Sequence, residues 1–227
     1  MGGGFSIPKS PSDTALVKVM MECIRIFPDT VIVGTALFAL FTLSIPFAVM
    51  FLGLLEASVV FHALKYISTF LGDGDNSDSR VSGRACSTGF SSASLRDVSI
   101  FSSKVSSNYP SAPIYIICVA AAYIFSSLNA QSEQLQALGP AYSSRYYISL
   151  SLLSTLIIIF SLFRLTQSCD TLSVILGTIP MGLAVGAVIL LQNSRLFGAE
   201  AINLIGIPSL AGVTATGKSL YVCPTVS

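Results

Sequence analysis

Long apolar stretches whose centres carry no ionisable residue dominate this chain of 227 residues. The hydrocarbon core of a bilayer requires about 20 consecutive, mainly apolar residues in a helix. Four stretches meet that requirement: Val31–Leu55, Ala112–Ala130, Tyr146–Leu165 and Leu172–Gln192. Because lipid offers no partners to backbone polar groups, a spanning segment satisfies them internally as a helix. The sequence therefore predicts an all-α polytopic membrane protein with about four transmembrane helices and additional amphipathic interfacial helices.

The composition agrees with a membrane protein and argues against several soluble functions. Charged residues make up 10% of the chain, whereas soluble domains contain about 25%. The 12 Lys and Arg nearly balance the 11 Asp and Glu, so the chain lacks the basic footprint of a nucleic-acid-binding protein. One His and 5 Cys without a C-x-x-C pair do not suggest a metal centre. We expect the lipid bilayer as a partner, no nucleic acid and no cofactor.

The remaining residues divide the chain around these spans. In chain order we expect a tail and amphipathic helix (1–29), a first span with an interfacial continuation (30–71), a Ser-rich hydrophilic loop (72–111), a three-span helical bundle (112–192) and a C-terminal tail (193–227). Pro28 is expected to end the amphipathic helix. Residues 56–71 have an alternative as a second short or re-entrant span, which would change the parity of the topology.

The first six residues fit the N-myristoylation pattern M-G-x-x-x-[ST], from Met1 to Ser6. Removal of Met1 would free Gly2 for a covalent myristate, and a flexible Gly-rich terminus is the alternative. Basic residues near the predicted membrane boundaries are balanced between the two sides, so charge does not set the orientation. Because myristoyl transfer occurs in the cytosol, a modified Gly2 would place the N-terminus there.

Residues Gly212 to Ser219 match the phosphate-binding pattern G-x-x-x-x-G-K-[ST] in full. A working loop of this kind follows a buried strand and precedes a helix whose N-terminus meets the phosphates. Only eight residues follow Ser219, and Pro224 lies among them, so a helix of useful length is not expected. We interpret the pattern as a turn in an extended tail and do not expect nucleotide binding.

Gly182 and Gly186 form a G-x-x-x-G motif in the fourth predicted span. Small residues at this spacing let two helix backbones approach closely, which drives association in lipid. We expect the motif to pack helices within this protein, and a homodimer seam is the alternative.

Transport or catalysis inside a bilayer usually leaves ionisable residues within the spans. None lies at a span centre in the assignment above, because Glu56, Arg164 and Asp170 all fall at span ends, where solvent would satisfy them. His62 has no placed carboxylate partner in the sequence, so a catalytic triad is not expected. These observations argue against an enzyme.

Two further segments are QLQALGPAYSSRYY, from Gln134 to Tyr147, and FGAEAINLIGIP, from Phe197 to Pro208. In both, the chain resembles multi-span membrane proteins of large DNA viruses of algae and other protists. The resemblance covers about half of the chain and includes no catalytic signature. It implies a virally encoded protein of the virion inner membrane, in contact with capsid or other membrane proteins, and N-myristoylated proteins are known in that setting.

Together these features predict a structural multi-pass integral membrane protein, a viral membrane component that contacts capsid or other membrane proteins. A small channel or transporter is the alternative. A conducting pore needs a polar lining, and the predicted spans offer only scattered Ser and Thr.

Overall fold

The structure is a computed structural model that describes residues 15–71, 109–132 and 140–204. These residues form five long helices and one short 3-10 helix, and they contain no strand. The elements are α1 (Ala15–Thr42), α2 (Ile45–Leu71), α4 (Ala112–Ala130), α6 (Pro140–Thr166), α7 (Leu172–Phe197) and η2 (Ala199–Ile202). All five long helices have the length and apolar composition needed to cross a bilayer. The predicted all-α polytopic fold is confirmed, with five candidate spans rather than about four.

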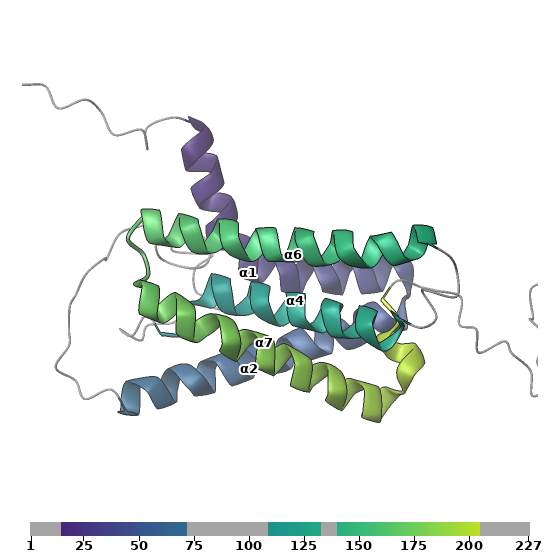
Figure 1. The fold of residues 1–227 in the computed structure, drawn as a ribbon. Helices are drawn as coiled ribbons and strands as arrows, with labels where there is room; N and C mark the ends of the chain where they lie inside the picture. The colour runs from purple at the N-terminus through teal and green to yellow at the C-terminus, as the bar shows by residue number, and fades with distance from the viewer. Residues whose placement is uncertain (1–14, 72–108, 133–139, 205–227) are drawn as a thin grey trace, which may run out of the picture.

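The five helices run alternately in opposite directions, so their ends gather at the two ends of an elongated bundle (Figure 1). We call one end the clamp end: it contains the start of α1, the end of α2, the start of α4 and the α6–α7 turn. We call the other the hairpin end: it contains the α1–α2 turn, the end of α4, the start of α6 and η2. An odd number of spans places the start of α1 and the end of α7 at opposite ends.

The predicted first span, Val31–Leu55, is wrong as a single segment, because a turn divides it between α1 and α2. Leu43 takes a left-handed conformation with φ of 50°, and Ser44 accepts the Ala48 backbone N–H at 3.1 Å to start α2. Pro46 then lies in the first helical turn, where a missing N–H breaks no helical hydrogen bond. Pro46 therefore helps to begin a new helix rather than interrupting one.

The predicted interfacial segments are parts of these same two helices. Residues 56–71 form the second half of α2, whose candidate span is Ile45–Ser68, so the alternative of a further span describes them better than an interfacial continuation. Pro28 does not end the N-terminal helix but lies inside α1. Figure 1 shows that α1 changes direction along its length, as expected for a helix with an internal proline. The C-terminal tail begins later than predicted, because α7 continues to Phe197.

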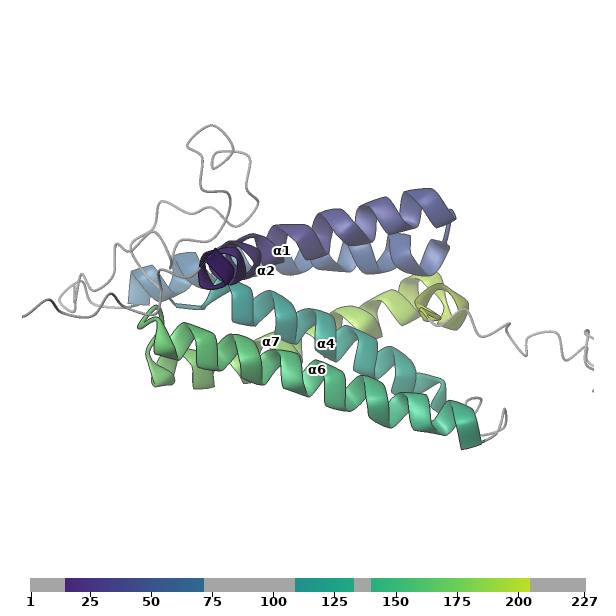
Figure 2. The same cartoon turned by 90° about the horizontal axis from the view of Figure 1, so that it is seen from above.

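The helix α4 is the centre of the bundle and contacts each of the other four long helices. Figure 2 shows α4 between the α1–α2 pair and α6. Its candidate span is 72% buried, whereas that of α6 is 11% buried. Tyr115, Ile116 and Cys118 are fully enclosed by the neighbouring helices. The main apolar core therefore lies around α4, and the other helices present much of their apolar surface outward.

Backbone contact between α4 and α7 depends on two glycines. A Cβ added at Gly182 would lie 2.7 Å from Cys118 Cβ and 2.9 Å from the Tyr115 carbonyl oxygen. A Cβ added at Gly186 would collide with the Val119 carbonyl oxygen and lie 2.9 Å from Ala122 Cβ. No side chain fits between the helices at these two positions, so the G-x-x-x-G motif faces α4 within the same chain.

We expect Gly186→Ala to destabilise the bundle, since the added methyl group would push α7 away from the α4 backbone. Overpacking of this kind typically costs about 1–3 kcal/mol. Thermal denaturation of the purified protein in detergent micelles measures the effect. Gly34→Ala in α1 is the matched control, because a Cβ at Gly34 meets nothing within 4 Å. Equal denaturation temperatures for the two variants would contradict the proposed role of Gly186.

Candidate functional site

A buried ion pair fastens the turn between α6 and α7 at the clamp end. Arg164 donates to Asp170 through two hydrogen bonds, from Nε to Oδ2 at 2.7 Å and from Nη2 to Oδ1 at 3.1 Å. The Arg164 side chain is 7% exposed and that of Asp170 is 0% exposed. Two parallel hydrogen bonds between charged groups hold the two side chains in one geometry and also add binding energy. The sequence interpretation of these residues as solvated span ends is wrong.

The local backbone explains why the two side chains meet. The Ser168 N–H donates to the Leu165 carbonyl at 3.0 Å and the Cys169 N–H donates to the Arg164 carbonyl at 2.9 Å. This hydrogen-bond pattern closes a helix C-terminus when the intervening residue is left-handed, and Ser168 has φ of 54°. The chain therefore reverses within residues 167–171, which brings Asp170 back over the last turn of α6.

The start of α4 joins this ion pair and extends it to a third helix. Ser111 Oγ donates to Asp170 Oδ2 at 2.6 Å, and the Ser111 backbone N–H donates to Thr178 Oγ1 at 3.2 Å. Thr178 is itself fully buried in α7. The clamp formed by Ser111, Arg164, Asp170 and Thr178 thus holds α4, α6 and α7 together at one end of the bundle.

Further polar side chains inside the bundle hydrogen-bond to neighbouring helices. The Tyr115 hydroxyl of α4 donates to the Ala57 carbonyl of α2 at 3.1 Å. Asn193 Nδ2 of α7 lies 3.4 Å from both the Tyr123 hydroxyl of α4 and the Val49 carbonyl of α2. Ser127 Oγ donates to the Ile202 carbonyl and thereby ties α4 to η2. These contacts connect the central helix to its neighbours along its length.

One carboxylate lies in the middle of a candidate span. Glu56 is the twelfth of the 24 residues of Ile45–Ser68, and Gln192 Nε2 of α7 donates to its Oε1 at 3.0 Å and its Oε2 at 3.2 Å. The apolar run Val31–Leu55 predicts Glu56 at a span end, because the run itself gives no sign of a break after Thr42. The structure corrects that assignment and gives the chain an ionisable group at mid-span.

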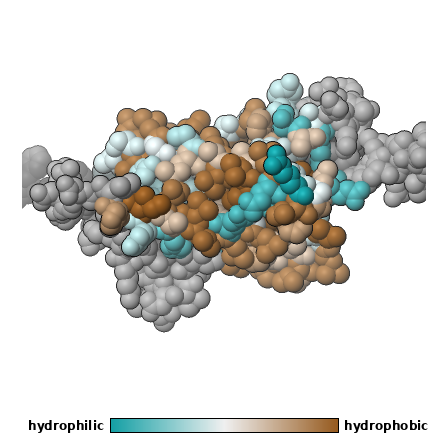
Figure 3. All heavy atoms as spheres, turned by 90° about the horizontal axis from the view of Figure 1, so that it is seen from below, coloured by the Kyte–Doolittle hydropathy of each residue, from teal (hydrophilic) through white to brown (hydrophobic). Residues whose placement is uncertain are grey.

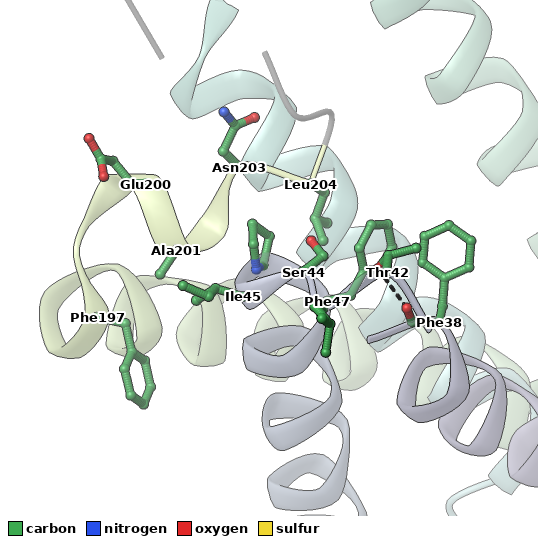
Figure 4. Close-up of a pocket in the computed structure, with 12 residues that line it drawn as sticks. Phe38, Thr42, Ser44, Ile45, Phe47, Phe197, Glu200, Ala201, Asn203 and Leu204 are labelled. Carbon is green, nitrogen blue, oxygen red and sulfur yellow. Dashed lines mark hydrogen bonds between the residues drawn. The ribbon is translucent and has the colours of Figure 1, made fainter. Parts of the chain in front are cut away.

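An open groove of about 620 Å³ lies at the hairpin end, between the α1–α2 turn and η2. Figure 4 shows the mainly apolar side chains that line it, with the carboxylate of Glu200 directed away from Ile45 and Phe47. His62, the only histidine of the chain, is exposed on α2 and stacks edge-on against Phe61 with ring centroids 5.5 Å apart. Among the described residues, no group of three or more His, Cys, Asp or Glu could hold a metal ion.

The residues singled out by the sequence are placed unevenly by the structure. Gly182 and Gly186 are brought against α4. The predicted lipidation residue Gly2 and the phosphate-binding pattern from Gly212 to Ser219 lie outside the described residues, so both remain sequence interpretations. The Arg164–Asp170 pair escaped sequence reasoning, and its only signal was the opposite charge of two residues flanking a tight turn.

Comparison of the chain with protein-family models, with curated proteins and with solved structures finds no match in any of the three.

We expect Asp170→Asn to destabilise the bundle strongly, because it removes the carboxylate charge that the buried Arg164 guanidinium binds through two hydrogen bonds. Removing one partner of a buried ion pair costs about 3–5 kcal/mol. Thermal denaturation in detergent micelles measures the loss. The control is Glu200→Gln on η2, because Glu200 is an exposed carboxylate that takes no part in the clamp. A denaturation temperature for Asp170→Asn equal to that of the control would show that the clamp carries little stability.

Proposed function

We propose that this chain is a multi-pass integral membrane protein with a structural role, a fixed helical body that organises a bilayer and binds other proteins. The observation that carries the proposal is the enclosed helix α4, whose polar side chains form hydrogen bonds with the neighbouring helices. Tyr115 reaches the α2 backbone, Ser127 reaches η2, and the clamp joins α4 to α6 and α7. Interhelical hydrogen bonds of this kind hold transmembrane helices in one arrangement.

The outer surface supports the membrane setting. Large apolar side chains on four helices point outward, including Phe41 at 84%, Val59 at 67%, Leu152 at 60% and Leu191 at 59% exposure. Monomeric soluble proteins rarely expose contiguous apolar surface on this scale. Five helices of this length and composition are compatible with an integral membrane protein.

The proposal extends to a setting and to partners. The resemblance of the segments from Gln134 to Tyr147 and from Phe197 to Pro208 to viral membrane proteins supports the inner membrane of a virus particle, with capsid or membrane proteins as partners. Myristoylation of Gly2 would place the N-terminus in the cytosol and hold the start of the chain against the leaflet.

A small channel or transporter is the second candidate, and Glu56 is the observation that favours it. Ionisable residues within spans mark ion pathways more often than other positions do. Glu56 is bound by Gln192 from the neighbouring helix, and both side chains lie toward the outer surface of the α2–α7 pair rather than inside the bundle. That position supports the structural role over conduction.

Reconstitution into liposomes tests the structural role directly. We expect proton, sodium and potassium flux from vesicles containing the wild-type protein to equal the leak of empty vesicles. A structural role involves no ion pathway through the bundle, so Glu56→Gln should leave that flux unchanged. Selective ion flux above the leak, abolished by Glu56→Gln, would overturn the structural role and establish the channel or transporter.

A further inference from the structure

A band of polar side chains crosses the outer face formed by α2 and α7. It contains Glu56 of α2 together with Gln192 and Arg195 of α7, and the amide of Gln192 joins the two helices through its bonds to the Glu56 carboxylate. Figure 3 shows a hydrophilic diagonal band across a largely hydrophobic side of the molecule. The band begins at mid-span on α2 and runs to the last turn of α7.

The surface around the band is apolar and points outward. Leu52 and Val59, one turn on either side of Glu56, are 51% and 67% exposed. On α7, Val188 and Leu191 are each 59% exposed. In a bilayer this face would meet lipid chains if nothing else covered it.

A charged residue on such a face is unusual. Ionisable side chains within spans nearly always face a bundle interior or a water-filled cavity, because lipid solvates them poorly. Within one copy of the chain, neither Glu56 nor Arg195 forms an ion pair with a described residue. The two opposite charges therefore lie on one outer face, on either side of Gln192, and are not paired with each other.

We propose that this face is the interface between two copies of the chain in the membrane, with Glu56 of each copy paired with Arg195 of the other. In an isologous interface, residue i of one copy contacts residue j of the second, and j contacts i. A patch that carries one negative and one positive group satisfies this rule by itself, so its charges complement those of an identical copy. The proposal rests on the membrane embedding argued above.

The positions of the charged groups agree with such a pairing. Arg195 lies one helical turn beyond Gln192, whose side chain already reaches the Glu56 carboxylate at 3.0 Å. Side chains on a helix lean toward its N-terminus, so the long Arg195 side chain is directed back along α7 toward that level. A two-fold axis along the membrane normal keeps every residue at its own depth, so the pairing requires Arg195 to reach back by one turn to the level of Gln192, which is the level of the Glu56 carboxylate.

The surface beside Arg195 also offers a hollow that side chains of a facing helix could enter. A groove of about 410 Å³ on α7 is lined by Val188, Leu191, Gln192, Arg195 and Leu196. Its walls are apolar except for the band itself, which suits exposed apolar side chains such as Leu52 from the second copy. Charge pairs and interdigitated apolar side chains would then share one interface.

Charge reversal with differently tagged copies tests the proposal. Copies that carry one of two different tags are co-expressed, extracted in mild detergent and purified through one of the tags, and the second tag is then measured. Wild-type copies should co-purify. When both copies carry Glu56→Arg, or both carry Arg195→Glu, the amount that co-purifies should fall at least tenfold, since each variant brings like charges together. Glu56→Arg copies co-expressed with Arg195→Glu copies should regain it, because every contact between them is again between opposite charges.

Several outcomes would overturn the dimer. They are failure of wild-type copies to co-purify, undiminished association of either single variant, or no recovery in the mixed pair. The doubly reversed variant Glu56→Arg/Arg195→Glu guards against misfolding, since it should self-associate like the wild type. Glu200→Arg on η2 is the matched control and should leave association unchanged. Alkaline carbonate extraction of the same membranes tests the embedding separately: protein retained there without recovery of pairing refutes only the dimer.

Discussion

Contact between the backbones of α4 and α7 is the constraint on which the rest of the bundle depends. Lipid chains are as apolar as leucine, so no hydrophobic force drives transmembrane helices together, and close packing has to replace it. Gly182 and Gly186 permit that packing, because a Cβ at either position would collide with α4. Since α4 touches every other long helix, the depth and tilt of α7 against it position the whole structure. The clamp at Asp170 then fixes one end of this arrangement.

Polar groups divide into two sets with different consequences. Those around α4 bond between helices and hold them in place, as the Tyr115 hydroxyl does with α2 and Ser111 does with Asp170. The second set, Glu56 with Gln192 and Arg195, lies on the outside of α2 and α7. Gln192 binds Glu56 there, but neither charged group forms an ion pair with a described residue of the same copy. The first set accounts for a rigid body, and the second indicates a surface that another copy covers.

Uninterrupted apolar runs bounded by polar residues made α4, α6 and α7 predictable from the sequence, and the small-residue spacing indicated the packing face of α7. The break between α1 and α2 was not predictable in the same way, because Leu43 is an apolar residue that makes a turn by taking a left-handed conformation. That error moved Glu56 from mid-span to a span end. The clamp also includes Ser111, which lies 59 residues before Asp170. No local sequence pattern indicates a contact between residues so far apart.

The most direct test of the five-span account is the accessibility of the α1–α2 turn. Ser44→Cys and Ser168→Cys are introduced separately into a background without the 5 native cysteines and treated with a membrane-impermeant thiol reagent in sealed, oriented vesicles. The account predicts that both positions react and that they react from opposite sides of the membrane, since Ser44 is at the hairpin end and Ser168 at the clamp end. Protection of Ser44 from both sides, as expected inside one continuous Val31–Leu55 span, would contradict it.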